Sequence, residues 1–184
     1  MAVLIVDMIN VFDFEGGERL KLRATSLVRP ILGLREQMDR LGAPTIYVND
    51  NFGEWHSEKA RLVARARAVA PEIVEPLAPR QGDFFVVKPQ LSGFYATNLP
   101  LLLPKLGVSR LVICGIAADI CVLFTAADAH MRDYALWLPR DAVAAENDDK
   151  AQTALAIVAS HLGGETASST DLDICAWMRA FDEE

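Results

Sequence analysis

The sequence predicts a three-layer α/β/α fold with a central, mostly parallel sheet of six strands. Short apolar runs alternate along the chain with longer amphipathic segments. Repeated strand-then-helix units of this kind form parallel sheets with right-handed crossovers. Most of the apolar runs are continuous, as expected of strands that helices cover on both faces.

The expected elements follow in order along the chain. The strands are Ala2–Val6, Pro44–Asn49, Phe84–Val87, Arg110–Cys114, Ala135–Pro139 and, with the weakest pattern, Glu165–Ala167. The helices are about Leu22–Leu41, Ser57–Ala70, Thr97–Leu106, Asp119–Arg132, Asp149–Leu162 and Asp171–Phe181. Several helices open with Ser, Thr or Asp and several close at Gly or Pro, which are common helix boundary residues.

Composition limits the class of protein. A chain of 184 residues suits one domain, so we expect a single domain over 1–184. The formal charge is 18 − 25 = −7 and no basic block is present, which argues against nucleic-acid partners. No apolar run approaches the ~18 residues of a membrane span. Three sparsely spaced cysteines argue against a disulfide framework and for a reducing compartment, the cytoplasm.

Three reactive side chains lie at or beyond strand ends, where parallel sheets bind ligands. Asp7 ends the first strand, Lys88 ends the third, and Cys121 lies six residues after Gly115 at the end of the fourth. Each alone has an ordinary structural explanation as a turn former, a solvated strand end or a core residue. Together they predict a site that combines a carboxylate, an ammonium and a thiol.

Cys121 is expected near the start of a helix, where backbone N–H groups lower the pKa of a thiol and can stabilise an oxyanion. A nucleophilic cysteine usually has a histidine base. His130 points away from the helix start and His161 is near the end of a later helix, whereas His56 can approach the site. Since none is well placed, Asp7 is the expected base, and Lys88 would hold its carboxylate.

Three stretches in this order resemble the isochorismatase-like cysteine hydrolases, a family that includes nicotinamidases, N-carbamoylsarcosine amidohydrolases and ureidoacrylate amidohydrolases. The stretches are LIVDMINVF, VVKPQLSGFYATNL and VICGIAADICVLFTAADAHMRDY. The resemblance covers nearly the whole chain and implies a Rossmann-like strand order. It also implies a triad of Asp7, Lys88 and Cys121, a cis peptide between Ile116 and Ala117, and an oxyanion hole formed by the N–H groups of Ala117 and Cys121.

The resemblance implies a hydrolase that cleaves a C–N bond of a small amide or ureide through a thioester. Isochorismatases proper often lack the cysteine, because they hydrolyse a vinyl ether, so Cys121 favours C–N hydrolysis. An isochorismatase-type vinyl-ether hydrolase and a non-catalytic binding member of the family remain the alternatives. Family members are commonly homo-oligomers, so we expect a dimer or tetramer, with neither nucleic-acid nor membrane partners.

The stretch after the second strand argues against a metal. Nicotinamidases hold a divalent metal there with an Asp-x-His pair and a further histidine. Here YVNDNFGEWHSEK has Asp50, but Phe52 stands where the first histidine would be and His56 is a single imidazole. One Asp and one His make a poor transition-metal site, so we expect no metal and no cofactor.

Aromatic and amide side chains after the strand ends are candidate substrate contacts, since a small-molecule pocket is mostly apolar with few polar anchors. They are Asn10, Phe12, Asn51, Phe52, Trp55 and Tyr95. The segment 57–80 mixes arginines with Ala and Val and is either a helix with a solvated basic face or a lid over the site.

Overall fold

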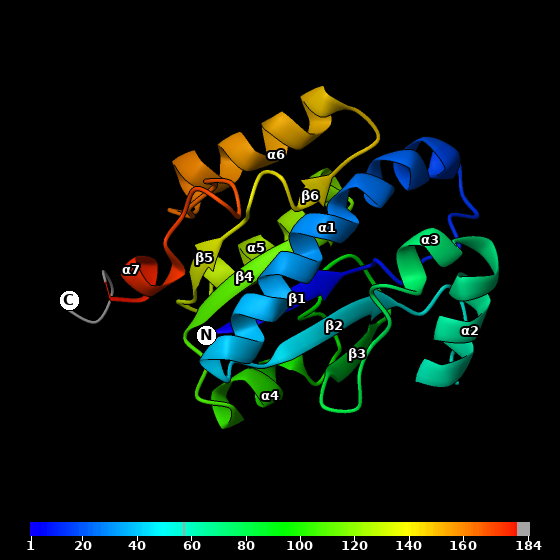
Figure 1. Cartoon of the computed structure of the whole chain (residues 1–184), viewed down its shortest axis with the longest axis horizontal. Helices are drawn as coiled ribbons and strands as arrows, with labels where there is room; N and C mark the ends of the chain where they lie inside the picture. The colour runs from blue at the N-terminus through cyan, green and yellow to red at the C-terminus, as the bar shows by residue number, and fades with distance from the viewer. Residues whose placement is uncertain (57, 180–184) are drawn as a thin grey trace.

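The computed structural model describes residues 1–56 and 58–179 and has one six-stranded sheet (Figure 1). The strands are β1 Ala2–Val6, β2 Thr45–Asp50, β3 Phe84–Lys88, β4 Arg110–Ile116, β5 Ala135–Trp137 and β6 Val143–Ala144. Their order is β3-β2-β1-β4-β5, with β6 also beside β4, and every pair is parallel. This confirms the predicted mostly parallel sheet and its Rossmann-like order.

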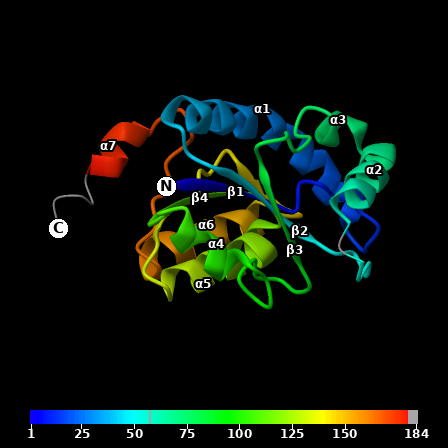
Figure 2. The same cartoon turned by 90° about the horizontal axis from the view of Figure 1, so that it is seen from below.

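Helices cover both faces of the sheet, which confirms the three-layer fold. They are α1 Gly17–Leu41, α2 Lys59–Val69, α3 Pro71–Val74, α4 Leu99–Lys105, the π-helical turn η1 Ala118–Val122, α5 Leu123–His130, α6 Asp148–His161 and α7 Ile174–Arg179. Figure 2 shows α1, α2 and α3 on one side of the strands and α4, α5 and α6 on the other. Within the described ranges, no helix is long and apolar enough to cross a membrane.

The central strand β1 is buried on both faces. Val3 and Ile5 pack into the core on the α1 side, while Leu4 and Val6 pack into the core on the α4, α5 and α6 side. All five residues of β1 are fully buried, as the continuous apolar pattern predicts. The sheet therefore holds the chain rigidly up to Asp7, where β1 ends.

The expected sixth strand at Glu165–Ala167 was wrong. Glu165 makes only a single parallel bridge with Trp137, and the sixth strand is Val143–Ala144. The Glu165 carboxylate accepts hydrogen bonds from the backbone N–H groups of Thr166 and Ala167, which ends the pairing. The strand at Val143–Ala144 pairs with the last two residues of β4 and is too short to show a sequence period.

Helix boundaries also differ from expectation. Helix α1 begins at Gly17, earlier than the expected Leu22, because Leu20 belongs to the same buried stripe as Ala24 and Leu27. The expected helix Asp119–Arg132 is divided into η1 and α5. For the expected helices Ser57–Ala70 and Asp171–Phe181, Ser57 and residues 180–181 lie outside the described residues.

The segment 58–80 packs as part of the core. Ile73, Val74 and Leu77 are fully buried, and the Tyr47 hydroxyl donates to the Leu77 carbonyl over 2.7 Å. Helices α2 and α3 therefore support β2 from the α1 side. None of the described residues of this segment lines the cavity at the ends of β1, β2 and β4.

Candidate active site

The ends of β1 and β3 and the turn η1 bring three reactive side chains together. Lys88 Nζ lies 2.9 Å from Asp7 Oδ2 and 3.3 Å from Cys121 Sγ. Lys88 Nζ therefore contacts both other groups, and the charge of Asp7 also acts on the Cys121 thiol. The backbone N–H of Asp50 donates to Asp7 Oδ1 over 2.7 Å and fixes the orientation of the carboxylate.

Burial sets the protonation of these groups. Asp7 is only 4 % exposed and Lys88 is fully buried. Burial raises the pKa of the Asp7 carboxyl, although Lys88 and Cys121 oppose the shift. Burial, the largest single influence, lowers the pKa of Lys88, but Asp7, Cys121 and Asp50 together outweigh it and raise that pKa above its ordinary value. Lys88 is therefore a fixed ammonium at neutral pH.

The thiol of Cys121 is held in its protonated form. Burial first and the Asp7 charge second raise the pKa of Cys121 to about 12, and Lys88 acts in the opposite direction. The sequence predicted a thiol made acidic by the helix start, and that prediction was wrong for the resting site because burial dominates. The thiol needs a nearby base to react, and Asp7 is a carboxylate that lines the same cavity and whose charge acts on the thiol.

The end of β4 presents Cys121 at the sheet edge. Gly115 has φ +114° beside Val6, and the peptide between Ile116 and Ala117 is cis. The chain then enters η1, a π-helical turn of the kind often found at functional sites. The Thr125 hydroxyl donates to the Cys121 carbonyl over 2.6 Å and holds the turn onto α5.

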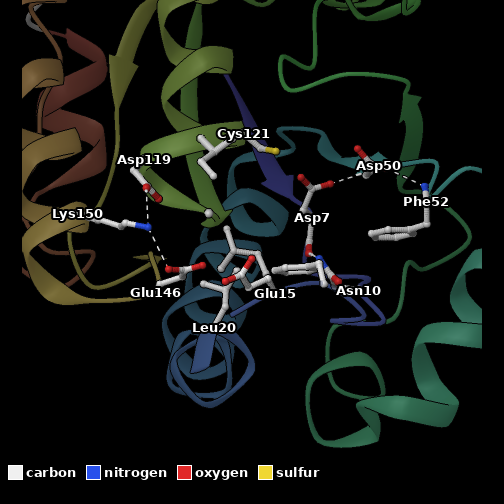
Figure 3. Close-up of a pocket in the computed structure, with 14 residues that line it drawn as sticks. Asp7, Asn10, Glu15, Leu20, Asp50, Phe52, Asp119, Cys121, Glu146 and Lys150 are labelled. Atoms are coloured by element: carbon white, nitrogen blue, oxygen red, sulfur yellow. Dashed lines mark hydrogen bonds and ion pairs between the residues drawn. The ribbon is translucent and has the colours of Figure 1, made fainter. Parts of the chain in front are cut away.

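A cavity of about 320 Å³ opens beside the three side chains (Figure 3). Its walls come from the ends of β1, β2 and β4, from η1, and from the starts of α1 and α6. The lining residues are Asp7, Asn10, Phe14, Glu15, Leu20, Asp50, Phe52, Ile116, Ala117, Asp119, Ile120, Cys121, Glu146 and Lys150. The Cys121 sulfur therefore borders a space that fits a small molecule.

Two of the six expected substrate contacts line this cavity. They are Asn10 and Phe52, although Asn10 Oδ1 already accepts a hydrogen bond from the Phe12 N–H over 2.7 Å. Asn10 thus shapes the loop after β1 with its oxygen and also donates from Nδ2 to the Asp7 carbonyl. Phe52 is held by a hydrogen bond from its N–H to Asp50 Oδ1.

The other four expected contacts lie elsewhere among the described residues. Phe12 is buried in the core on the α1 side, and Asn51 Oδ1 accepts from the Gly53 N–H in a tight turn. Trp55 is 77 % exposed beyond the cavity, and Tyr95 borders a separate surface pocket with Phe124. Positions after a strand end do not by themselves determine which side of the loop faces the site.

Seven cavity residues were not foreseen from the sequence as site residues. Phe14 and Glu15 belong to the loop between β1 and α1, Leu20 to α1, Asp119 and Ile120 to η1, and Glu146 and Lys150 to the region where α6 begins. A weak signal existed for the last two, because Glu146 and Lys150 are four residues apart around the N-cap Asn147 and form an ion pair of 3.0 Å.

No histidine lines the cavity in the described part of the chain. His56, His130 and His161 are all exposed. Residues 1–56 and 58–179 contain no group of three or more His, Cys, Asp or Glu side chains placed to hold a metal ion. Asp50 itself is engaged, since its Oδ1 accepts from the Phe52 N–H and its Oδ2 lies 3.4 Å from Lys88 Nζ. These residues do not fit the nicotinamidase type of metal site.

The other two cysteines stand apart from the site. Cys114 is fully buried within β4, and Cys175 is exposed in α7. Cys121 is the partly buried thiol that borders the cavity.

Comparison with known proteins agrees with this geometry and confirms the resemblance seen in the sequence. The Isochorismatase domain model matches residues 1–171. The uncharacterized isochorismatase family protein YaaI of Bacillus subtilis is 38% identical over 172 residues, covering 93% of this chain and 95% of that protein.

Two amide-cleaving proteins are also similar. The ureidoacrylate amidohydrolase RutB of Agrobacterium fabrum is 28% identical, covering 72% of this chain and 71% of that protein. The crystal structure of N-carbamoylsarcosine amidase from Thermoplasma acidophilum superposes with a TM-score of 0.72 at 29% identity, covering 94% of this chain and 98% of that one. The chain therefore belongs to the isochorismatase family of hydrolases.

Proposed function

We propose that this protein is a metal-independent cysteine hydrolase that cleaves the C–N bond of a small amide or ureide through a thioester. The observation that carries the proposal is that Lys88 Nζ contacts both the Cys121 sulfur and the Asp7 carboxylate, and that Asp7 and Cys121 both line the same cavity. The similarity to two amide-cleaving proteins supports the bond type.

In the first half-reaction Asp7 acts as the base. Its carboxylate takes the proton of the Cys121 thiol while the sulfur attacks the carbonyl carbon, which forms a tetrahedral oxyanion. The raised pKa of Asp7 makes it a stronger base than an exposed aspartate and reduces the pKa difference from the thiol. Asp7 then donates this proton to the leaving nitrogen, the C–N bond breaks, and a thioester on Cys121 remains.

In the second half-reaction water hydrolyses the thioester. Asp7, again a carboxylate, takes a proton from the water as its oxygen attacks the thioester carbon. The C–S bond then breaks, the acid product leaves, and the proton on Asp7 returns to the sulfur. Lys88 stays charged throughout, so it stabilises both the carboxylate and the developing thiolate.

We assign the oxyanion hole to the backbone N–H groups of Ala117 and Cys121. Both residues line the cavity; Ala117 directly precedes η1 and Cys121 lies within its first turn, where helix N–H groups lack partners within the helix and carry partial positive charge. Removing one donor of such a pair typically lowers the rate by ~10²–10³.

A panel of small amides, ureides and carbamoyl compounds tests the proposal, with ammonia or amine release as the readout. Wild type is expected to hydrolyse members of the panel, and Cys121→Ala is expected to hydrolyse none of them. Cys175→Ser is the matched control, since it removes an exposed thiol outside the site. Equal rates for wild type and Cys121→Ala would remove the catalytic claim, and pyruvate release from isochorismate alone would favour vinyl-ether hydrolysis.

The compartment, the oligomeric state and the domain organisation are proposed from simpler observations. Three free thiols suit a reducing compartment, so we propose a cytoplasmic location. Leu101, Phe124 and Met131 are large apolar side chains at least half exposed, which supports a homo-oligomer that light scattering can measure. The match over residues 1–171 supports a single domain over 1–184.

A further inference from the structure

We propose that the cavity selects a small amide or ureide that carries no negative charge, either neutral or cationic. This inference rests on the proposed function, because it concerns the substrate of the same site. It is carried by the charges that border the cavity and by how completely its cations are already paired.

Carboxylates dominate the charged groups that line the cavity. Among the described lining residues there are five, contributed by Asp7, Glu15, Asp50, Asp119 and Glu146, against one lining ammonium from Lys150. Lys88, which does not line the cavity, adds a second ammonium 2.9 Å from Asp7, and the mostly exposed Arg19 lies 3.7 Å from Glu146. Even with these cations counted, the site has an excess of negative charge.

Both ammonium groups at the cavity are already held by two carboxylates. Lys88 Nζ lies 2.9 Å from Asp7 and 3.4 Å from Asp50. At the opposite end, Lys150 Nζ lies 3.0 Å from Glu146 and 4.0 Å from Asp119. Figure 3 marks both ion pairs with dashed lines. A carboxylate on a substrate would have to displace one of these partners and would then face the displaced charge.

Asp119 is the least compensated of the four partner carboxylates. In the described structure its Oδ1 is buried without a hydrogen-bond partner, and its Oδ2 is only at the 4.0 Å limit of an ion pair with Lys150. A buried oxygen of this kind raises the cost of bringing a second anion nearby. Between the two charged ends the walls are apolar, with Phe14, Leu20 and Ile120 among the lining residues. A neutral or cationic molecule with a short apolar body matches this lining.

Alkylation of Cys121 by iodoacetamide and by iodoacetate tests the selectivity, because these reagents are similar in size and differ in charge. The protein carries Cys175→Ser, which leaves Cys121 and the fully buried Cys114. At Cys121 the rate with iodoacetamide is divided by the rate with iodoacetate. This ratio is then divided by the same ratio for a free uncharged thiol, N-acetylcysteinamide. We expect a preference for iodoacetamide of about tenfold or more, which falls in 1 M NaCl.

Charge variants at the end of the cavity far from the triad test whether the charges there cause the preference for iodoacetamide. Asp119→Asn and Glu146→Gln are expected to weaken the preference for iodoacetamide, and Lys150→Gln is expected to strengthen it. Asp171→Asn is the matched control, because it removes an exposed carboxylate that pairs with Arg140 outside the cavity, and it should leave the ratio unchanged.

The outcomes separate this inference from the proposed function. A normalised ratio of one, or faster reaction with iodoacetate, would show that an ammonium is open to anions and would overturn the inference. Failure of iodoacetamide to label Cys121 overturns it too, since access to the cavity is its premise. Labelling requires no turnover, so failure of the proposed function appears only in the amide panel, where Cys121→Ala would then match wild type.

Discussion

The ammonium of Lys88 lies 2.9 Å from the carboxylate of Asp7, and both side chains are almost completely buried. A buried ion pair is stable only where each charge keeps its partner. The two charges act on the Cys121 thiol in opposite directions: the Asp7 carboxylate raises its pKa and the Lys88 ammonium lowers it. This balance leads to predictions that separate the acidity of the thiol from the catalysis.

Removing the charge of Asp7 is expected to make the thiol more acidic and the enzyme inactive. In Asp7→Asn, Lys88 stays beside Cys121 while the negative charge is lost, so the pKa of Cys121 falls below about 12. We expect iodoacetamide to alkylate Cys121 roughly tenfold faster, one pKa unit being a tenfold change, while hydrolysis of every panel member is lost. Slower alkylation together with lost activity would mean that Asp7 mainly holds the fold.

Removing the charge of Lys88 is expected to act in the opposite direction on the thiol. Lys88→Gln leaves Cys121 facing the Asp7 carboxylate alone, which raises the pKa of the thiol and slows its alkylation. Breaking one partner of a buried pair also destabilises a fold by about 3–5 kcal/mol, so thermal unfolding is measured beside the labelling. Alkylation as fast as in wild type, in a folded variant, would show that Lys88 does not act on Cys121.

The acid side of the pH profile reports on Asp7. Hydrolysis needs the carboxylate form, and burial raises the pKa of Asp7 above 3.8. Activity is therefore present above the raised pKa and is lost as the pH falls through it, so kcat/KM should drop at a higher pH than for an ordinary aspartate. A flat profile down to pH 4 with the protein still folded would contradict Asp7 as the base.

Asp50 is expected to position the site without taking part in the chemistry. Its backbone N–H holds Asp7, and Asp50→Asn keeps that bond while removing the charge 3.4 Å from Lys88. We expect kcat/KM to fall by about tenfold, or ~1.4 kcal/mol. A loss as large as that of Asp7→Asn would place Asp50 among the reacting groups.

Gly115 is expected to be essential for the geometry of the β4 end. A Cβ there would collide with the Val6 carbonyl oxygen at a φ of +114°, which other residues rarely adopt. Gly115→Ala should lower the free energy of unfolding by about 3 kcal/mol or more. Gly107→Ala is the matched control, since that glycine also has a positive φ but open space around it, and about 1 kcal/mol is expected in urea unfolding.

The sequence was sufficient for five of the six strands and for placing three reactive residues at the edge of the sheet. Asp7 and Lys88 end strands whose apolar patterns are unambiguous, and parallel strands carry their carboxyl ends to one edge. Cys121 follows from the same rule with Gly115 as the marker of the strand end.

The far end of the cavity was not predictable in the same way. Glu146 and Lys150 reach it because α6 packs against η1, a tertiary contact that no local pattern encodes. The raised pKa of Cys121 was missed for a related reason. The helix start predicts a lowered thiol pKa. Burial in the folded protein raises that pKa by more, and burial is set by tertiary packing that the local sequence does not encode.

The most direct measurement of the central claim is the mass of the Cys121 peptide after rapid quenching of wild type during the first turnover of a hydrolysed amide. The account predicts a transient acyl adduct on Cys121 that disappears as the acid product forms. Amide hydrolysis that proceeds through the first turnover with the Cys121 peptide unmodified at every time point would contradict it.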